Sequence, residues 1–144
     1  MTLVRVFRLV PLAAIWILAA GCTESVTSPS GHAPFSQSDV RLGTGTDAVA
    51  GKVLTVHYTG WLYNGSEPTL KGLQFETSAG GTPFSFTLGA GQVITGWDQG
   101  LVGMKVGGIR RLIIPPSLAY GGSRNGVIPV NATLVFDVEL TDVQ

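Results

Sequence analysis

The sequence predicts an α+β domain in which a mostly antiparallel sheet wraps over one short helix. Several segments alternate apolar and polar residues, as half-buried strands do. One segment, residues 92–103, instead has apolar residues at spacings of three and four, which indicates a helical face. The length of 144 residues fits a single domain, and 12% charged residues with 20 glycines indicate that this domain is compact and rich in turns.

The predicted helix lies within residues 92–103. We expect Thr95 to cap its N-terminus and Asp98 to place negative charge near the positive end of the helix. Glycines near its end keep the helix short. Trp97 in this helix is either an ordinary core residue or a rigid apolar floor that faces the curved sheet. The predicted apolar face consists of Val93, Ile94, Trp97, Leu101 and Val102.

Residues 1–21 have the pattern of an export signal. Two arginines precede the apolar run 9–20, which is too short to span a bilayer as a helix. The run continues into Leu18-Ala19-Ala20-Gly21-Cys22, which resembles a bacterial lipobox, except that Ala19 stands where such boxes usually have Leu. We expect Cys22 to receive lipid after cleavage. Cys22 is the only cysteine, which favours lipidation because a single cysteine cannot form an intramolecular disulfide. The alternative is ordinary secretion with Cys22 as a free thiol.

The lipidated Cys22 and a flexible tether are predicted to occupy residues 22–38, and the folded domain residues 39–144. The tether is rich in Ser, Thr, Pro and Gly and cannot bury enough apolar surface to order itself. One lipid chain binds a membrane only marginally, so stable anchoring requires several chains. We expect a protein of the bacterial cell envelope that contacts the membrane through its lipid anchor only and faces the periplasm or the cell exterior.

The strands of the domain follow the alternating segments, and turn residues separate them. A loop or a bulged crossing is expected at residues 61–71, a turn at 79–82 and a long Gly-rich loop at 117–130. Pro115 and Pro116 end the fourth strand, because proline cannot donate to a strand ladder. The predicted strands lie within residues 54–59, 73–75, 84–88, 110–114 and 134–140.

Composition and motifs exclude several classes of function. The formal net charge is zero and the sequence has no basic stripe, so nucleic acid is not an expected partner. Two histidines and one cysteine give no metal-ligand cluster, and we expect neither metal nor cofactor. Gly89-Ala90-Gly91 lacks the spacing and the following Lys-Ser or Lys-Thr of a phosphate loop. His57 has no recognisable nucleophile beside it and is expected to be a strand histidine with a satisfied hydrogen bond.

Several separate motifs occur together in the order typical of one family. They are His57-Tyr58-Thr59-Gly60, Phe75, Pro83-Phe84-Ser85-Phe86, Val93-Ile94, Gly96-Trp97-Asp98, Ala119-Tyr120-Gly121, Ile128-Pro129 and the segment 131–140. Through these motifs, residues 40–144 resemble an FKBP-type peptidyl-prolyl cis-trans isomerase. The resemblance implies a five- or six-stranded antiparallel sheet curved around a short helix, in agreement with the alternation described above.

The resemblance also implies a pocket with Trp97 as its floor. The backbone N–H of Ile94 and the hydroxyl of Tyr120 are the implied donors to carbonyl groups of a ligand. Glu76 departs from the family, which usually has Asp at this position, and Gly80-Gly81 stand where an Arg is often found. The implied site residues are Tyr58, Phe75, Glu76, Phe84, Val93, Ile94, Trp97, Tyr120, Ile128 and Phe136.

The function implied by the resemblance is isomerisation of Xaa–Pro bonds in unfolded or flexible proteins, in an apolar aromatic pocket and without covalent catalysis. Macrolides such as rapamycin and tacrolimus are implied ligands. We expect a monomer that assists the folding of exported proteins. Two alternatives remain open: a membrane-tethered chaperone module that binds proline peptides with little isomerase activity, and a structural envelope lipoprotein that binds no proline peptide.

Overall fold

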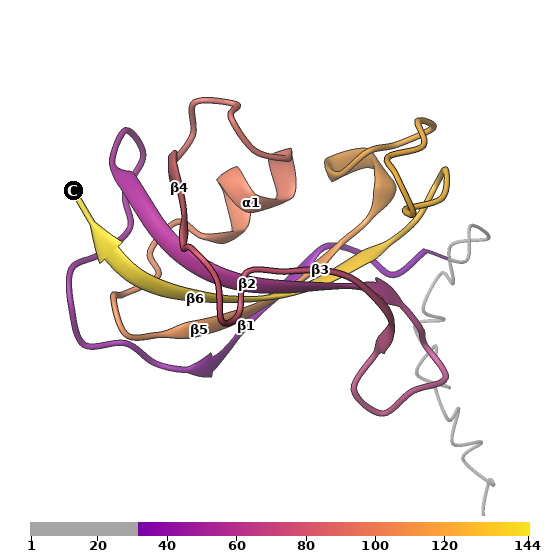
Figure 1. Ribbon diagram of the computed structural model, residues 1–144, viewed down its shortest axis with the longest axis horizontal. Helices are drawn as coiled ribbons and strands as arrows, with labels where there is room; N and C mark the ends of the chain where they lie inside the picture. Colours follow the sequence, from indigo (N-terminus) through magenta and orange to yellow (C-terminus); the bar gives the residue numbers. More distant parts are fainter. Residues whose placement is uncertain (1–31) are drawn as a thin grey trace, which may run out of the picture.

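The fold is described by a computed structural model that covers residues 32–144 (Figure 1). The predicted signal, Cys22 and most of the predicted tether lie outside the described residues. Within residues 32–144, no helix is both long enough and apolar enough to cross a membrane.

Six strands form one antiparallel sheet (Figure 1). The sequence predicts the antiparallel arrangement, and its alternating segments account for five of the six strands. The order across the sheet is β1-β5-β6-β2-β3, and β4 pairs with the first half of β2 while β3 pairs with its second half. The long strands β2 and β6 therefore form the centre of the sheet. The strands are β1 Ser36–Arg41, β2 Val53–Tyr63, β3 Lys71–Thr77, β4 Phe84–Thr87, β5 Ile109–Ile114 and β6 Leu134–Val143.

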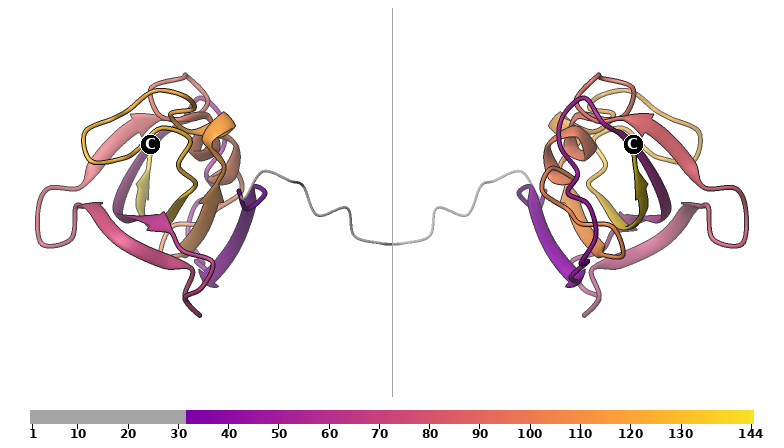
Figure 2. Two further views of the ribbon diagram at one scale, coloured as in Figure 1. Left: turned by 90° about the vertical axis from the view of Figure 1, so that its right-hand side faces the viewer. Right: turned by 90° about the vertical axis from the view of Figure 1, so that its left-hand side faces the viewer.

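One short α-helix, α1 (Thr95–Gly100), lies on the concave side of the sheet, between β4 and the 116–130 loop (Figure 1). The views along the sheet show how its strands curve around this side (Figure 2). Two glycines bring α1 close to β5: a Cβ atom on Gly96 would lie 2.5 Å from Ile114, and one on Gly100 would lie 2.6 Å from Leu112. A 3₁₀ helix, η1 (Pro116–Leu118), follows β5 and begins the long loop.

The core fills the space between α1 and the sheet. Burial alternates along β5, and along β6 from Phe136 to Leu140. The inward side chains include Leu112 and Ile114 of β5 and Phe136, Val138 and Leu140 of β6, as the alternation in the sequence predicts. The fully or almost fully buried side chains include Leu54, Val56, Phe86, Leu88, Trp97, Leu101, Leu112, Ile114, Leu134, Phe136, Val138 and Leu140.

The buried Arg110 of β5 connects the end of α1 to β1. Its Nη1 donates to the carbonyl oxygens of Gly100 and Val102, both at 3.0 Å, just where the helix ends. Its Nε and Nη2 donate to the two carboxylate oxygens of Asp39 in β1, at 2.7 and 3.2 Å. A helix end needs partners for its last carbonyl groups, and a buried guanidinium needs a counter-ion. Arg110 meets the first need and Asp39 meets the second, so β1 helps to hold α1.

The structure differs from the sequence predictions at several element boundaries. Strand β1 begins at Ser36, inside the segment predicted to be a tether. Thr95 does not cap the helix: Ile94 is the N-cap residue and makes no side-chain capping bond. Val102 is 46% exposed instead of facing the core. The interruption expected at residues 61–71 begins later, because β2 continues to Tyr63 and only residues 64–70 form the loop before β3. The pairing of β2 with β3 also shifts register on both sides of Trp61.

Candidate active site

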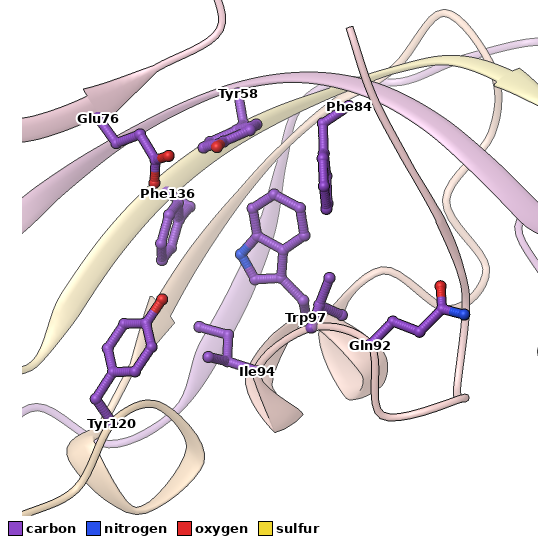
Figure 3. A pocket seen from close by; sticks show the side chains of 9 residues that line it. Tyr58, Glu76, Phe84, Gln92, Ile94, Trp97, Tyr120 and Phe136 are labelled. Carbon is purple, nitrogen blue, oxygen red and sulfur yellow. The ribbon is translucent and has the colours of Figure 1, made fainter. Parts of the chain in front are cut away.

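An open cavity of about 180 Å³ lies between α1, the sheet and the 116–130 loop (Figure 3). Strands β2, β3, β4 and β6 each contribute one side chain to its wall. The loop before α1, the helix itself and the segment after η1 contribute the rest. The lining residues are Tyr58, Glu76, Phe84, Gln92, Val93, Ile94, Trp97, Tyr120 and Phe136.

Trp97 forms the floor of this cavity and is only 4% exposed. Tyr58 and Phe136 stand edge-on against its indole ring, with centroids 5.1 and 5.3 Å away. The buried indole nitrogen has no hydrogen-bond partner in the described part of the chain. Figure 3 shows this nitrogen on the side of Phe136, and the rings meet at 87°. The indole N–H can therefore donate a weak hydrogen bond to the ring of Phe136, and this contact helps to fix the orientation of the indole.

Two of the predicted site residues do not line the cavity. Phe75 stands behind Phe136, with ring centroids 5.6 Å apart, and supports that ring from the outside. Gly60 makes room for this pair, since a Cβ atom there would lie 2.6 Å from Phe75 and 2.8 Å from Phe136. Ile128 is 5% exposed and belongs to the core. Of the two, Phe75 shapes the wall through its contact with Phe136.

Two polar donors remain available at the cavity. The backbone N–H of Ile94 makes no hydrogen bond within residues 32–144, although the Ile94 carbonyl accepts from the N–H of Trp97 at 2.9 Å. Tyr120 points its hydroxyl over the cavity toward Phe136 (Figure 3), and this hydroxyl likewise has no partner among the described residues. Donors that are left unpaired beside aromatic and aliphatic side chains are suited to carbonyl groups of a bound chain.

The carboxylate of Asp98 fixes the loop that leads into α1. It accepts hydrogen bonds from the backbone N–H of Gly89 at 2.8 Å and of Gly91 at 3.1 Å. These glycine N–H groups are thus already occupied, in agreement with the sequence argument against a phosphate loop. The side-chain oxygen of Gln92 accepts from the N–H of Thr87 at 2.8 Å and holds the same loop to β4.

The phenol of Tyr58 is held in its neutral form. The pKa of Tyr58 is raised to about 12. Burial is the largest cause, followed by the hydrogen bond to Glu76, the negative charge of Glu76 and the charge of Tyr120. Figure 3 shows the Glu76 carboxylate beside this hydroxyl at the rim of the cavity. Tyr58 can therefore donate a hydrogen bond at every physiological pH.

The cavity can position a ligand and exclude water from it. A histidine, which could take part in covalent chemistry, is not among its lining residues. His57 lies in β2, and its Nδ1 is 3.1 Å from the Ser78 hydroxyl and 3.2 Å from the Ser78 carbonyl oxygen. This confirms the prediction of a strand histidine with a satisfied hydrogen bond. Residues 32–144 contain no cluster of metal-ligating side chains. An apolar floor with a few convergent donors is an arrangement that binds a small ring and its neighbouring carbonyl groups.

Residues 45–141 match the family model for FKBP-type peptidyl-prolyl cis-trans isomerase. The chain belongs to this family. It is an FKBP-type isomerase whose curved sheet and central helix carry an aromatic cluster. The chain is 50% identical over 107 residues to the FK506-binding protein of Neisseria meningitidis serogroup B, a match that covers 73% of this chain and 92% of that relative.

Solved structures of FKBP-type proteins share the fold. The crystal structure of FkpA from Escherichia coli is similar with a TM-score of 0.65 and 40% identity over 76% of this chain, which spans 48% of FkpA. The crystal structure of AtFKBP13 is similar with a TM-score of 0.63 and 37% identity, over 81% of this chain and 96% of that one.

Gln92 is the lining residue that sequence reasoning missed in this FKBP-type isomerase. Its position directly before Val93 and Ile94 could have indicated this, because consecutive residues that lead into a short helix lie at the same end of that helix. A polar side chain within an apolar motif nevertheless reads as a solvated loop residue. Its contact with Thr87, across the turn between β4 and α1, depends on a chain reversal that the sequence pattern does not specify.

Proposed function

We propose that this isomerase rotates Xaa–Pro bonds in the cavity above Trp97 and assists the folding of exported proteins. The observation that carries the proposal is the cavity itself: a buried indole floor and aromatic walls, with two unpaired donors at its edge. The proline ring would lie on Trp97, and the adjacent carbonyl groups would accept from Ile94 N–H and the Tyr120 hydroxyl.

The proposed mechanism lowers the rotational barrier by removing water from the amide. The uncatalysed barrier of about 18–20 kcal/mol comes from the partial double-bond character of the C–N bond. The planar amide is the more charge-separated form, and water stabilises it. Replacing water with the rings of Tyr58, Phe84 and Phe136 therefore destabilises the planar ground state relative to the less polar twisted amide.

The two donors would add stabilisation that differs between the ground state and the transition state. Rotation about the C–N bond turns a substrate carbonyl out of the amide plane, so a fixed donor can meet it better in one geometry than in the other. Only such differential binding accelerates the step. A donor on the backbone, as at Ile94, is held by the start of α1 and needs no side-chain ordering.

Exchange spectroscopy on a Leu-Pro peptide with the purified chain tests the proposal. We expect faster cis–trans exchange, and loss of this acceleration when Tyr58, Phe84 and Trp97 are replaced together by Ala. Binding of the peptide without faster exchange would instead identify a chaperone module that holds proline segments. An absence of peptide binding would contradict both functions and favour a structural role.

Macrolide binding belongs to the same proposal. The Neisseria meningitidis relatives bear the name FK506-binding protein. Rapamycin and tacrolimus carry a pipecolyl ring that has the shape of proline, and this ring would occupy the floor formed by Trp97. Because the same apolar surface would serve both ligands, a macrolide is expected to compete with Xaa–Pro peptides.

The proposed place of action is outside the cytoplasm. The apolar run that ends at Cys22 supports export and lipid anchoring at the bacterial cell envelope, with the domain facing the periplasm or the cell exterior. Exported chains reach this space unfolded, and their slow prolyl isomerisation takes tens of seconds or more at 25 °C. An anchored isomerase would act on such chains as a monomer.

A further inference from the structure

The cavity has a single ionised side chain at its rim. Of its nine lining residues, Glu76 is the one carboxylate, and none is Lys, Arg or His. Glu76 extends from β3, and its carboxylate faces inward beside Tyr58 and Phe136 (Figure 3). A chain bound on Trp97 would therefore pass a negative charge that no positive lining residue offsets.

Glu76 also has no cation partner elsewhere in the described part of the chain. Four other carboxylates within residues 32–144 form ion pairs with Lys or Arg: Asp39, Asp47, Asp137 and Glu139. The lysine on its own strand, Lys71, lies 2.6 Å from Asp137 on the opposite face of the sheet. The turn after β3, residues 78–82, is Ser-Ala-Gly-Gly-Thr and carries no charge.

The charge of Glu76 reaches the interior of the cavity. It contributes to the raised pKa of Tyr58, whose hydroxyl lies between the carboxylate and the indole floor. Glu76 is itself exposed, so solvent screens part of this effect. A ligand that covers the cavity would displace some of that water and strengthen the interaction with any charge it brings.

We propose that Glu76 selects Xaa–Pro segments that carry Lys or Arg directly beside the proline. This inference rests on the proposed catalysis in the cavity above Trp97. The cationic head group would meet the carboxylate at the rim, while the aliphatic stem of the side chain lies against the aromatic wall. Acidic residues beside proline are disfavoured by the same charge. A partly exposed ion pair is expected to change kcat/KM by about two- to fivefold.

A cycle of two peptides and two proteins isolates this effect. Norleucine has nearly the shape of the lysine side chain without its charge, so the ratio of kcat/KM for Lys-Pro to that for norleucine-Pro removes most of the apolar contribution. We compare this ratio between the full chain and its Glu76→Gln variant, with the test residue placed before or after the proline. The proposal expects the ratio to fall by about two- to fivefold in the variant for at least one placement.

Two controls complete the experiment. Glu67 lies in the exposed turn between β2 and β3 and away from the cavity, so Glu67→Gln should leave the ratio as it is in the original chain. Salt at about 1 M, where the screening length is about 3 Å, should lower the ratio of the original chain toward that of Glu76→Gln. The salt measurement uses no substitution and so does not depend on the variant folding.

The outcomes separate this inference from the function on which it rests. In one outcome, the chain accelerates norleucine-Pro exchange, but neither Glu76→Gln nor salt changes the ratio of kcat/KM for Lys-Pro to that for norleucine-Pro in either placement. This outcome would overturn the selection of cations and leave the proposed isomerase site intact. A ratio that falls equally in Glu67→Gln would also overturn it, because the effect would then come from net charge. A chain that accelerates no peptide would overturn both.

Discussion

Trp97 is the residue on which the proposed site depends most. Replacing it with Ala removes the floor, and we expect macrolide affinity to fall at least about thirtyfold, as for a buried aromatic anchor. The fluorescence of Trp97 should also be quenched when rapamycin covers the ring, and this quenching should disappear in Trp97→Ala. Fluorescence titration measures both effects.

Trp61 supplies the matched control for this titration. It lies on the opposite face of the sheet, where the Lys71 ammonium group stands 3.8 Å above its ring. Trp61→Phe should therefore retain both the quenching and the affinity. Unchanged macrolide affinity in Trp97→Ala would show that the ligand lies somewhere else.

Tyr58 gives a second test at the scale of one residue. The chain has three tyrosines, and the pKa of Tyr58 is raised to about 12, above its ordinary value of 10.0. A raised phenol pKa means that folding opposes ionisation, so stability is unaffected below pH 10 and declines as the pH rises beyond it. In an ultraviolet absorbance titration we expect one tyrosine to ionise late, near pH 12.

The late step should vanish in Tyr58→Phe and persist in Tyr63→Phe. Ionisation of Tyr58 near its ordinary value of 10.0, in a chain that is still folded, would argue against the burial and the Glu76 contact on which the raised pKa depends. Far-ultraviolet circular dichroism in the same samples establishes whether the chain is folded at each pH.

At the residue scale, sequence motifs located the centre of the cavity better than its edge. Tyr58, Trp97 and Phe136 lie in runs whose alternation or helical spacing fixes the side that they face. Phe75 shares such a run, but the bulges in β2 on both sides of Trp61 shift the neighbouring register, and Phe75 ends behind Phe136. Register shifts of this kind follow from pairing across strands, which a single run of sequence does not encode.

The helix α1 is short and depends on its neighbours for its position. Asp98 holds the preceding loop through two backbone N–H groups. We expect Asp98→Ala to lower the free energy of unfolding by about 1–3 kcal/mol, because two donors lose a charged acceptor. The same loop carries Ile94, so KM for Leu-Pro peptides should rise as well.

Asp98→Asn is the informative companion to Asp98→Ala. The amide keeps one acceptor oxygen and should recover part of both effects, which chemical denaturation and peptide kinetics can measure. Equal stability of Asp98→Ala and the original chain would show that the loop is held by Gln92 and by packing alone.

At the scale of elements, periodicity predicted the strands of the sheet except the first. Strand β1 has no buried side chain along its length, so the alternation that reveals other strands is missing there. Strand β1 contributes to the fold by pairing with β5 and through the contact of Asp39 with Arg110. The prediction that Thr95 caps the helix is also wrong. The N-cap position is occupied by Ile94, an apolar residue that lines the cavity.

The whole molecule should lose stability at acid pH through one ion-pair network. Although burial raises the pKa of Asp137, hydrogen bonds and charges from Arg111 and Lys71 outweigh burial and lower the pKa below its ordinary value. The stabilisation is therefore fully present above about pH 4 and is lost as the pH falls through the lowered folded-state value. We expect Asp137→Asn to be less stable at neutral pH and to lose less stability below pH 4.

Denaturation midpoints measured from about pH 7 to pH 3 test this expectation. Glu139→Gln is the matched control, because its partner Arg41 is 54% exposed and an exposed pair contributes little. An acid-stability slope that Asp137→Asn leaves unchanged would assign the loss to other carboxylates.

The attachment of the molecule to a membrane is a prediction about the whole chain. We expect the protein extracted from its producing cell to begin at Cys22 and to carry the mass of acyl chains. Intact mass spectrometry measures both properties at once. Cys22→Ser should abolish acylation, and an unmodified N-terminus at another residue would contradict the anchoring proposal.

The contact between Asp39 and Arg110 has a practical consequence for fragments of this protein. The family match begins at residue 45, so a fragment cut to that limit would lack β1 and the carboxylate that faces the buried guanidinium. Because Asp39 is partly solvated, the uncompensated charge should cost about 2–3 kcal/mol, somewhat less than for a fully buried pair. Such a fragment would also expose the edge of β5, which invites pairing with other chains. A soluble fragment should therefore start before Phe35, whose ring packs against the end of α1.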